Sequence, residues 1–356
     1  MTRRTVTLAG LLIALAALLV PPAGARQGAT ARLDVFVGND PDSGMTRLYF
    51  LDALSGLSTV VNVEGGRAFT LLGDYVLYEK ERTGAIMRAN ADGTLQPHPF
   101  IRRGVAIERV RWIAAADGQA VAWVEVNAQG ISAVYVARAD GSDLRQLPIS
   151  TPGAGQMLLP LALSEDMARL VYDAAHPLEP PAPALFEVYH HVGIFSLADD
   201  QFVPLTGEPL CPCGAAASPD GRLVARLEGA EGRGPFALRL WDVPSGAEIV
   251  VPPPTLPYRR AGDLILNERG TLAAYSAAME NGPPYALIVV DVVARRQRLA
   301  LSSEAARYIP LAFADSDTAL LLTEARAGGT FKLDLTTGDL LRVSDKRYLG
   351  AIVVSR

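Results

Sequence analysis

A pattern of strands and turns recurs about every 40 residues along this chain, and it constrains the fold more than any other feature. The clearest copy occupies residues 214–251. It holds an apolar strand, the turn Ser-Pro-Asp-Gly at 218–221, strands at 222–227 and 238–242, a turn at 244–246 and a strand at 248–251. Short strands separated by Asp-Gly and Ser-Gly turns indicate antiparallel hairpins. Each copy therefore predicts one four-stranded unit.

Related copies follow one another along the rest of the chain. Their first turns lie near residues 73, 116, 164, 267 and 315, and each turn leads into an apolar strand. The first copy is incomplete, because residues 33–37 already match the second strand of the other units. The missing first strand is found at the other end, at 348–354. Complementary ends of this kind close a ring and leave no open edge.

These observations predict an all-β fold, a single β-propeller of about seven four-stranded blades that spans residues 26–356 and is closed by its C-terminal strand. The turn at 218–221 and the Leu-Trp-Asp-x-x-Ser-Gly stretch at 240–246 resemble the propeller repeats of TolB-type and WD-like proteins. That resemblance implies the fold but no particular function. TolB also carries an α/β domain before its propeller, whereas Leu33 of this chain already lies in a predicted strand.

The N-terminal residues have the pattern of a secretory signal peptide. Arg3 and Arg4 precede an uncharged run at 6–20, and Ala-Gly-Ala at 23–25 offers a cleavage site before Arg26. The run is shorter than the roughly 20 residues that a spanning helix needs. We therefore expect residues 1–25 to be removed and the protein to be exported to the periplasm or beyond, with no membrane span left after cleavage.

Loop length predicts which face of the propeller carries the function. The turns between the first and second strands of a blade, and between the third and fourth, are short throughout. The long segments, at 151–156, 174–188 and 252–260, all belong to the opposite face. Long irregular loops on a rigid scaffold are common binding sites, although neutral variation in loop length is the alternative.

Arginines recur near the predicted start of the innermost strand in five blades. They are Arg67, Arg109, Arg260, Arg307 and Arg347. Such a ring around the channel mouth would attract carboxylate or phosphate groups, unless the arginines only meet solvent or pair with local acids. With the adjacent Tyr258, Arg259 and Tyr308 they form the predicted ligand-binding set, for an envelope protein, a peptide or a small anionic ligand.

Cys211 and Cys213 enclose a proline, and His190 and His191 are predicted on the same face. A disulfide, free thiols or a zinc or copper site are all compatible with these residues, and no metal is assigned. No cofactor is expected, because dinucleotide and Walker fingerprints are missing from the sequence, as is the Gly-x-Ser-x-Gly elbow of hydrolases.

Acidic residues at the end of the third strand repeat from blade to blade, which predicts a structural role in the turn. They are Asp52, Asp242, Asp291 and Asp334. Trp112, Trp123 and Trp241 are expected in the blade cores. The net charge of −5 argues against nucleic acid as a partner.

The sequence therefore favours an exported, monomeric binding module of the cell envelope. A lactonase-like or lyase-like propeller enzyme with its site at the channel mouth is the alternative, and a metal-carrying propeller is a third.

Overall fold

The computed structural model describes residues 30–355 apart from 41–44, 150–154, 179–184, 204, 206–213 and 231–232. Within these ranges the chain forms strands and turns and no helix. Accordingly, none of the described residues belongs to a helix with the length and apolarity needed to cross a bilayer. The predicted signal peptide at 1–25 lies outside the described residues.

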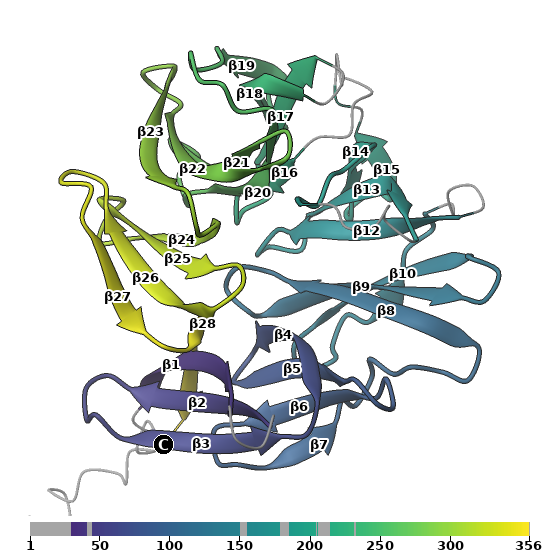
Figure 1. Cartoon of the computed structure of the whole chain (residues 1–356). Coiled ribbons are helices and arrows are strands. Elements are labelled where there is room, and N and C mark those ends of the chain that lie inside the picture. Colours follow the sequence, from purple (N-terminus) through teal and green to yellow (C-terminus); the bar gives the residue numbers. More distant parts are fainter. Residues whose placement is uncertain are drawn as a thin grey trace, which may run out of the picture.

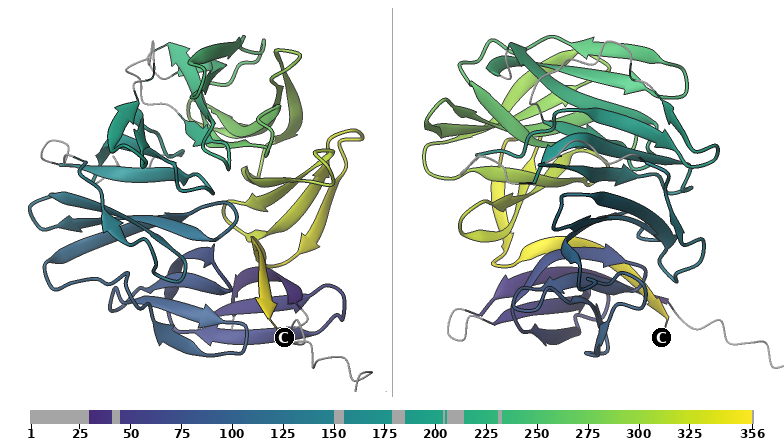
Figure 2. Two further views of the ribbon diagram at one scale, coloured as in Figure 1. Left: turned by 180° about the vertical axis from the view of Figure 1, so that it is seen from behind. Right: turned by 90° about the vertical axis from the view of Figure 1, so that its right-hand side faces the viewer.

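The strands form seven four-stranded antiparallel sheets, which lie around a common centre as the blades of a propeller (Figures 1 and 2). From the innermost strand outward, the first four blades consist of β28 (Arg347–Ser355), β1 (Thr30–Asn39), β2 (Thr46–Asp52) and β3 (Ser58–Val63); β4 (Gly66–Leu72), β5 (Tyr75–Lys80), β6 (Ile86–Asn90) and β7 (Leu95–Pro97); β8 (Ile107–Ala114), β9 (Ala120–Asn127), β10 (Ser132–Arg138) and β11 (Arg145–Gln146); and β12 (Gln156–Leu163), β13 (Arg169–Pro177), β14 (Val192–Ser196) and β15 (Gln201–Val203).

The other three blades consist of β16 (Ala215–Ala217), β17 (Leu223–Ala230), β18 (Arg233–Asp242) and β19 (Ala247–Val251); β20 (Arg260–Leu266), β21 (Leu272–Met279), β22 (Gly282–Asp291) and β23 (Arg296–Ser303); and β24 (Tyr308–Ala314), β25 (Ala319–Glu324), β26 (Gly328–Asp334) and β27 (Leu340–Ser344). The predicted fold class and the predicted number of blades are both confirmed.

The last strand of the chain closes the ring. β28 pairs antiparallel with β1, from Thr30 opposite Ser355 to Val37 opposite Arg347. Figure 1 shows β28, in yellow, beside the purple β1. Blade one is therefore built from both ends of the described chain, as the incomplete first repeat predicted.

In blades two to seven the second strand is deeply buried, because apolar side chains occupy both of its faces between neighbouring blades. In β9 the buried residues include Val121, Trp123 and Val124. Trp241 is likewise buried, whereas Trp112 is only partly buried and donates its indole N–H to Thr70 Oγ1 over 3.0 Å. The tryptophans thus contribute to blade packing.

The repeated aspartates at the end of the third strand cap the turns that follow. Asp334 Oδ1 accepts backbone N–H groups of Thr336 and Thr337 at 2.7 and 2.9 Å. Asp291 Oδ1 accepts the N–H of Ala294 at 2.8 Å. These hydrogen bonds confirm the structural role that repetition predicted.

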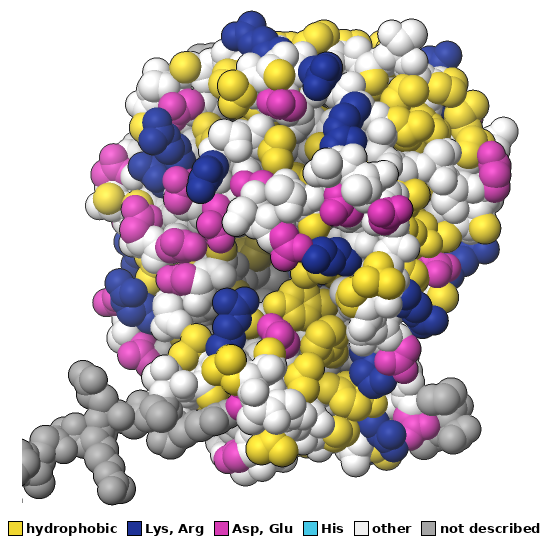
Figure 3. All heavy atoms as spheres, turned by 90° about the vertical axis from the view of Figure 1, so that its left-hand side faces the viewer, with side chains coloured by type: hydrophobic (Ala, Val, Ile, Leu, Met, Phe, Trp, Pro, Cys, Tyr) yellow, Lys and Arg dark blue, Asp and Glu magenta, His cyan; other side chains and the backbone are white. Residues whose placement is uncertain are grey.

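The two faces of the ring differ in their connections. Short turns join the first and second strands, and the third and fourth strands, on what we call the turn face. The long connections, such as 178–191 and 252–259, lie on the opposite face, which we call the long-loop face. On the side of the ring formed by blade seven, charges of both signs are interspersed with apolar side chains (Figure 3). This side therefore carries no field of a single sign.

Candidate functional site

The five predicted arginines lie at one level of the ring, at the starts of the inner strands on the long-loop face. Arg67 is the second residue of β4 and Arg109 the third residue of β8. Arg260 and Arg347 are the first residues of β20 and β28. Arg307 directly precedes β24. Their shared position follows from the repeat, but their surroundings differ.

Arg67 and Arg109 are engaged within the protein. Arg67 donates from Nε and Nη2 to the two carboxylate oxygens of Glu79, at 3.0 and 2.8 Å, and this hydrogen bonding raises the pKa of the guanidinium. Arg109 donates to the carbonyl of Leu178, at the start of the blade-four insertion 178–191. The first is a local ion pair, and the second helps to hold the insertion.

Arg307 forms a recessed ion pair with Asp263, which lies in the inner strand β20 of the neighbouring blade. Arg307 Nη1 lies 2.5 Å from Asp263 Oδ2, and the two side chains are only 18% and 17% exposed. Burial raises the pKa of Asp263, although Arg307 acts against that rise. The Asp263 backbone has a φ of 54°, a left-handed conformation that costs a non-glycine residue energy.

Phe186 connects this ion pair to the insertion of blade four. The Arg307 guanidinium carbon lies 5.1 Å from the centre of the Phe186 ring, within cation–π range. A Cβ placed on Gly262 would come within 2.6 Å of Phe186, so the aromatic side chain packs directly on the backbone of β20. The insertion therefore reaches from blade four to blades six and seven.

Arg260 and Arg347 are the predicted arginines with the greatest freedom to bind a ligand. Both are exposed, and among the described residues neither has a carboxylate within ion-pair distance. The protein around Arg347 nevertheless lowers the pKa of its guanidinium by desolvation. A cation that reaches solvent from such surroundings gains more from an anionic partner than one on an open surface.

The remaining members of the predicted set serve mainly in packing. Tyr258 is 8% exposed and belongs to the core between blades five and six. Arg259 donates to the carbonyl of Gly234 at 2.8 Å. Tyr308 is half-buried with its ring against Phe331. Each of these side chains thus already has a contact within the protein.

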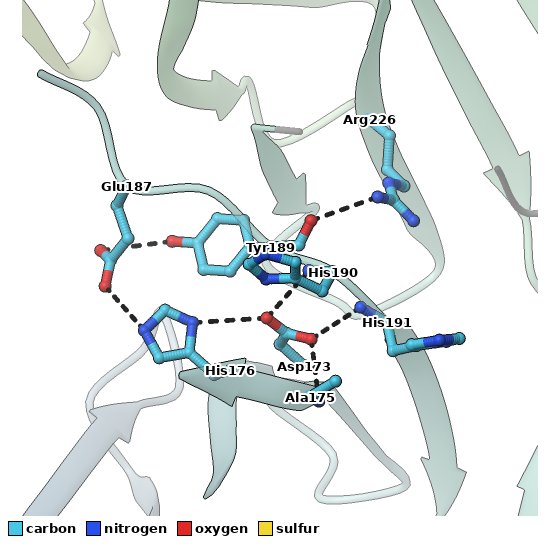
Figure 4. A network of polar contacts seen from close by, with 8 residues as sticks. All are labelled: Asp173, Ala175, His176, Glu187, Tyr189, His190, His191 and Arg226. Carbon is cyan, nitrogen blue, oxygen red and sulfur yellow. Dashed lines mark hydrogen bonds and ion pairs between the residues drawn. The ribbon is translucent and has the colours of Figure 1, made fainter. Parts of the chain in front are cut away.

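Asp173, in the middle of β13, organises the insertion (Figure 4). Its fully buried carboxylate accepts the backbone N–H groups of Ala175, His190 and His191 at 3.2, 3.1 and 2.8 Å. His176 Nδ1 lies 3.3 Å from the same carboxylate. Burial alone would raise the pKa of Asp173, but these hydrogen bonds outweigh burial and hold the pKa below its usual range.

The network continues outward from His176 to solvent. His176 Nε2 lies 3.6 Å from Glu187, whose side chain is 61% exposed. The hydroxyl of Tyr189 donates to Glu187 at 3.5 Å, and burial raises the pKa of this phenol. The fully buried Arg226 of β17 donates to the carbonyl of Tyr189 at 3.3 Å. These contacts fix the insertion against blade five, as Figure 4 shows.

The metal interpretation of the histidines gains no geometric support from the described ranges. His190 and His191 bind Asp173 through their backbone N–H groups. Among the described residues, no group of three or more His, Cys, Asp or Glu side chains is placed to hold a metal ion. Cys211 and Cys213 lie outside the described residues.

Sequence reasoning missed Asp173, Asp263 and Phe186 as organisers of this region. A usable signal existed for the two aspartates, since each interrupts a run of apolar residues within its strand. Charges in such positions are costly unless they have partners, and so they indicate specific contacts. No comparable signal marked Phe186, because an irregular insertion has no period from which its contacts can be predicted.

Fold and site together define a seven-bladed β-propeller with an asymmetric long-loop face. No protein-family profile matches the sequence, and no curated protein matches it. Solved structures do resemble it. An oligogalacturonate lyase from Vibrio parahaemolyticus shares 12% identity with a TM-score of 0.57, over 83% of this chain and 95% of that one.

Two further likenesses differ in coverage. A puromycin-hydrolysing peptidase from Mycobacterium tuberculosis shares 16% identity with a TM-score of 0.57, over 89% of this chain and 53% of that one. TolB from Acinetobacter baumannii shares 13% identity with a TM-score of 0.45, over 77% of this chain and 64% of that one. At these identities the likenesses with TM-scores above 0.5 establish the propeller fold alone.

Proposed function

We propose that the protein is an exported binding propeller of the cell envelope, which holds an anionic ligand or an acidic segment of a partner protein on its long-loop face. The observation that carries the proposal is the pair Arg260 and Arg347, exposed at the starts of inner strands on either side of blade seven. Export rests on the signal-peptide pattern at 1–25.

The electrostatics of this sector support an anionic ligand. The Asp263 carboxylate is already paired with Arg307, so that pair leaves little net charge to repel an anion. Arg260 and Arg347 then remain as exposed cations, and Arg347 in particular is partly desolvated by the protein around it. Bidentate hydrogen bonds from such guanidinium groups to carboxylate or phosphate are strong. Phe186 of the insertion packs on Gly262, two residues after Arg260 in β20.

Binding of a labelled Glu-rich peptide and of oligogalacturonate tests the proposal, since both probes present several carboxylates. In the Arg260→Ala, Arg347→Ala double variant we expect binding at least about tenfold weaker, with a smaller salt dependence. Arg269→Ala, an exposed change in the turn between β20 and β21, is the matched control and should bind as the parent does. Equal binding by parent and double variant would refute the choice of face.

A propeller enzyme of lyase or lactonase type is the second candidate, and Asp263 is the observation in its favour. A recessed carboxylate with a raised pKa and a left-handed backbone has properties that acid–base catalysts share. Turnover of oligogalacturonate or of a lactone series, lost in Asp263→Asn without loss of folding, would establish this candidate in place of a binding module.

A further inference from the structure

The turn face is hollowed between neighbouring blades over the first part of the ring. A cavity of about 860 Å³ lies between blades one and two, and another of about 610 Å³ lies against blades two and three. Both are lined by Asp74 and Arg88. They therefore adjoin one another over three blades, and we call the pair the turn-face groove.

Apolar side chains stand at both parts of the turn-face groove. Leu57 lines the first cavity and is 71% exposed, and Val353 of β28 lines the second and is 61% exposed. Leu54, in the same turn as Leu57, is 96% exposed. Exposed apolar groups beside a concave surface are typical of sites that bind another chain.

The cations of the groove already have partners. Arg88 donates to Gln96 at 2.6 Å and lies 5.8 Å from the centre of the Tyr75 ring. Arg138 pairs with Asp143 at 2.9 Å. The charge of Arg138 is thus compensated by Asp143, whereas Arg88 keeps its charge and is held in place by a neutral amide.

The carboxylates leave an excess of negative charge. Those that line the groove are Asp52, Asp74, Asp92, Asp117 and Asp140. Hydrogen bonds from Thr94 and Ser142 lower the pKa of Asp92 and of Asp140, so both are ionised at neutral pH. Asp74 sits where the two cavities meet and is available to a cation from either side.

The wall behind the groove is rigid and keeps its charge constant. The hydroxyl of Tyr75 lies 2.8 Å from His98 Nε2 and donates to the carbonyl of Ala139 at 3.3 Å. Burial lowers the pKa of His98 to about 4, so this imidazole is neutral at physiological pH. A preorganised wall reduces the entropy lost when a ligand binds.

From this geometry we infer that the turn-face groove is a second docking surface, and that its occupant is an extended segment of a partner protein with alternating basic and apolar side chains. The two adjoining cavities suit an extended chain, and the ionised carboxylates suit its Lys or Arg side chains. Leu57 and Val353 contact the apolar ones. The inference does not rest on the proposed function, which concerns the other face.

A short fluorescent peptide of alternating Lys and Leu, titrated with the purified protein, tests this inference. We expect saturable binding that weakens about tenfold in the Asp74→Asn, Asp117→Asn double variant and severalfold in Leu57→Ser. Glu268→Gln is the charge control, because Glu268 is exposed in the corresponding turn of blade six. Leu341→Ser is the apolar control, because Leu341 is 63% exposed on β27.

Both controls should bind the peptide as the parent does. An equal loss of binding in Glu268→Gln would mean that the peptide is attracted by the overall charge of the molecule, and this result would refute the docking surface. Unchanged binding in the double variant, or no saturable binding, would refute it as well. The Arg260→Ala, Arg347→Ala variant should still bind the Lys-Leu peptide. If this variant binds the Lys-Leu peptide but no longer binds the acidic probes, the result concerns the proposed site on the long-loop face and leaves the turn-face groove untouched.

Discussion

The turn face and the long-loop face use the same chemical group, an aspartate that accepts backbone hydrogen bonds, in opposite settings. On the turn face, Asp291 and Asp334 each cap a short turn, remain partly exposed and recur from blade to blade. On the long-loop face, Asp173 is fully buried and binds the backbone of His190 and His191 near the end of the long insertion of blade four. Aspartates that recur from repeat to repeat thus belong to the common scaffold, whereas Asp173, which departs from the repeat, belongs to the specialised insertion of blade four.

This contrast first predicts unequal costs for one substitution. Asp173→Asn should lower the free energy of unfolding by about 3 kcal/mol, because the buried side chain loses its charge and its NH2 group, in place of Oδ2, would face the N–H of His190. Asp334→Asn, the matched change on the turn face, should cost much less, because this side chain stays in contact with solvent and its amide oxygen can still accept the turn N–H groups. Urea denaturation of both variants measures the difference, and equal costs would remove the distinction between the faces.

A second change tests whether the insertion depends on close packing. Gly262→Ala should cost about 2 kcal/mol, since the new methyl group would lie 2.6 Å from Phe186 Cβ and force the insertion away from β20. Gly338→Ala on the turn face is the control. It meets no atom within 4 Å, so only the strain of its φ of 80° opposes it. Thermal unfolding should show the larger loss for Gly262→Ala, and the reverse order would contradict the packing that we describe.

The buried histidine beneath the turn face predicts a pH dependence. Because the pKa of His98 is lowered to about 4 in the folded protein, the unfolded chain binds more protons between pH 4 and about 6.5. The free energy of unfolding should therefore fall by about 1 kcal/mol from pH 7 to pH 5.5 through this residue. Asp173, whose pKa is lowered, contributes stability that is lost only below the usual carboxyl range.

The His98→Gln variant isolates this contribution. Its stability should change less than that of the parent protein between the same two pH values, as measured by urea denaturation at each pH. Parallel pH profiles for the two proteins would show that His98 is not held neutral by burial.

The smallest expected effect concerns the carboxylates of the turn face. Burial and the neighbouring Asp117, Glu268 and Asp220 raise the pKa of Glu165, so its charge is mildly unfavourable there. Glu165→Gln should raise the free energy of unfolding by about 0.3 kcal/mol at low salt, and the gain should shrink in added salt. A loss of stability on this substitution would argue against a negative turn face.

The scaffold could be predicted from the sequence because each blade repeats the same arrangement of strands and turns. Turn aspartates, buried second strands and the complementary first and last strands all follow from a period that is visible in the residues. The positions of Arg260, Arg307 and Arg347 at one level of the ring followed from the same alignment.

The partners of those arginines could not be predicted, because they come from neighbouring blades. Arg307 meets Asp263 of blade six and Phe186 of blade four, and such contacts depend on the curvature of the whole ring. Arg67 lies within one residue of the position that Arg260 and Arg347 hold in their own repeats, yet of these three only Arg67 is paired with a glutamate in the described residues. The alignment of the repeats therefore predicted where the arginines lie. Which of them are free to bind a ligand depends on the packing of neighbouring blades.

Closure of the ring by β28 also sets the order in which the molecule can fold. The hydroxyl of Tyr348 donates to Asp34 at 3.3 Å, although the two residues are 314 positions apart in the chain. Contacts between such distant residues carry a high entropic cost and form late. Blade one is therefore completed after the locally folded blades, and until then the edge of β1 has unpaired backbone groups. During folding, that edge is the part of the chain most exposed to mistaken pairing with a second molecule.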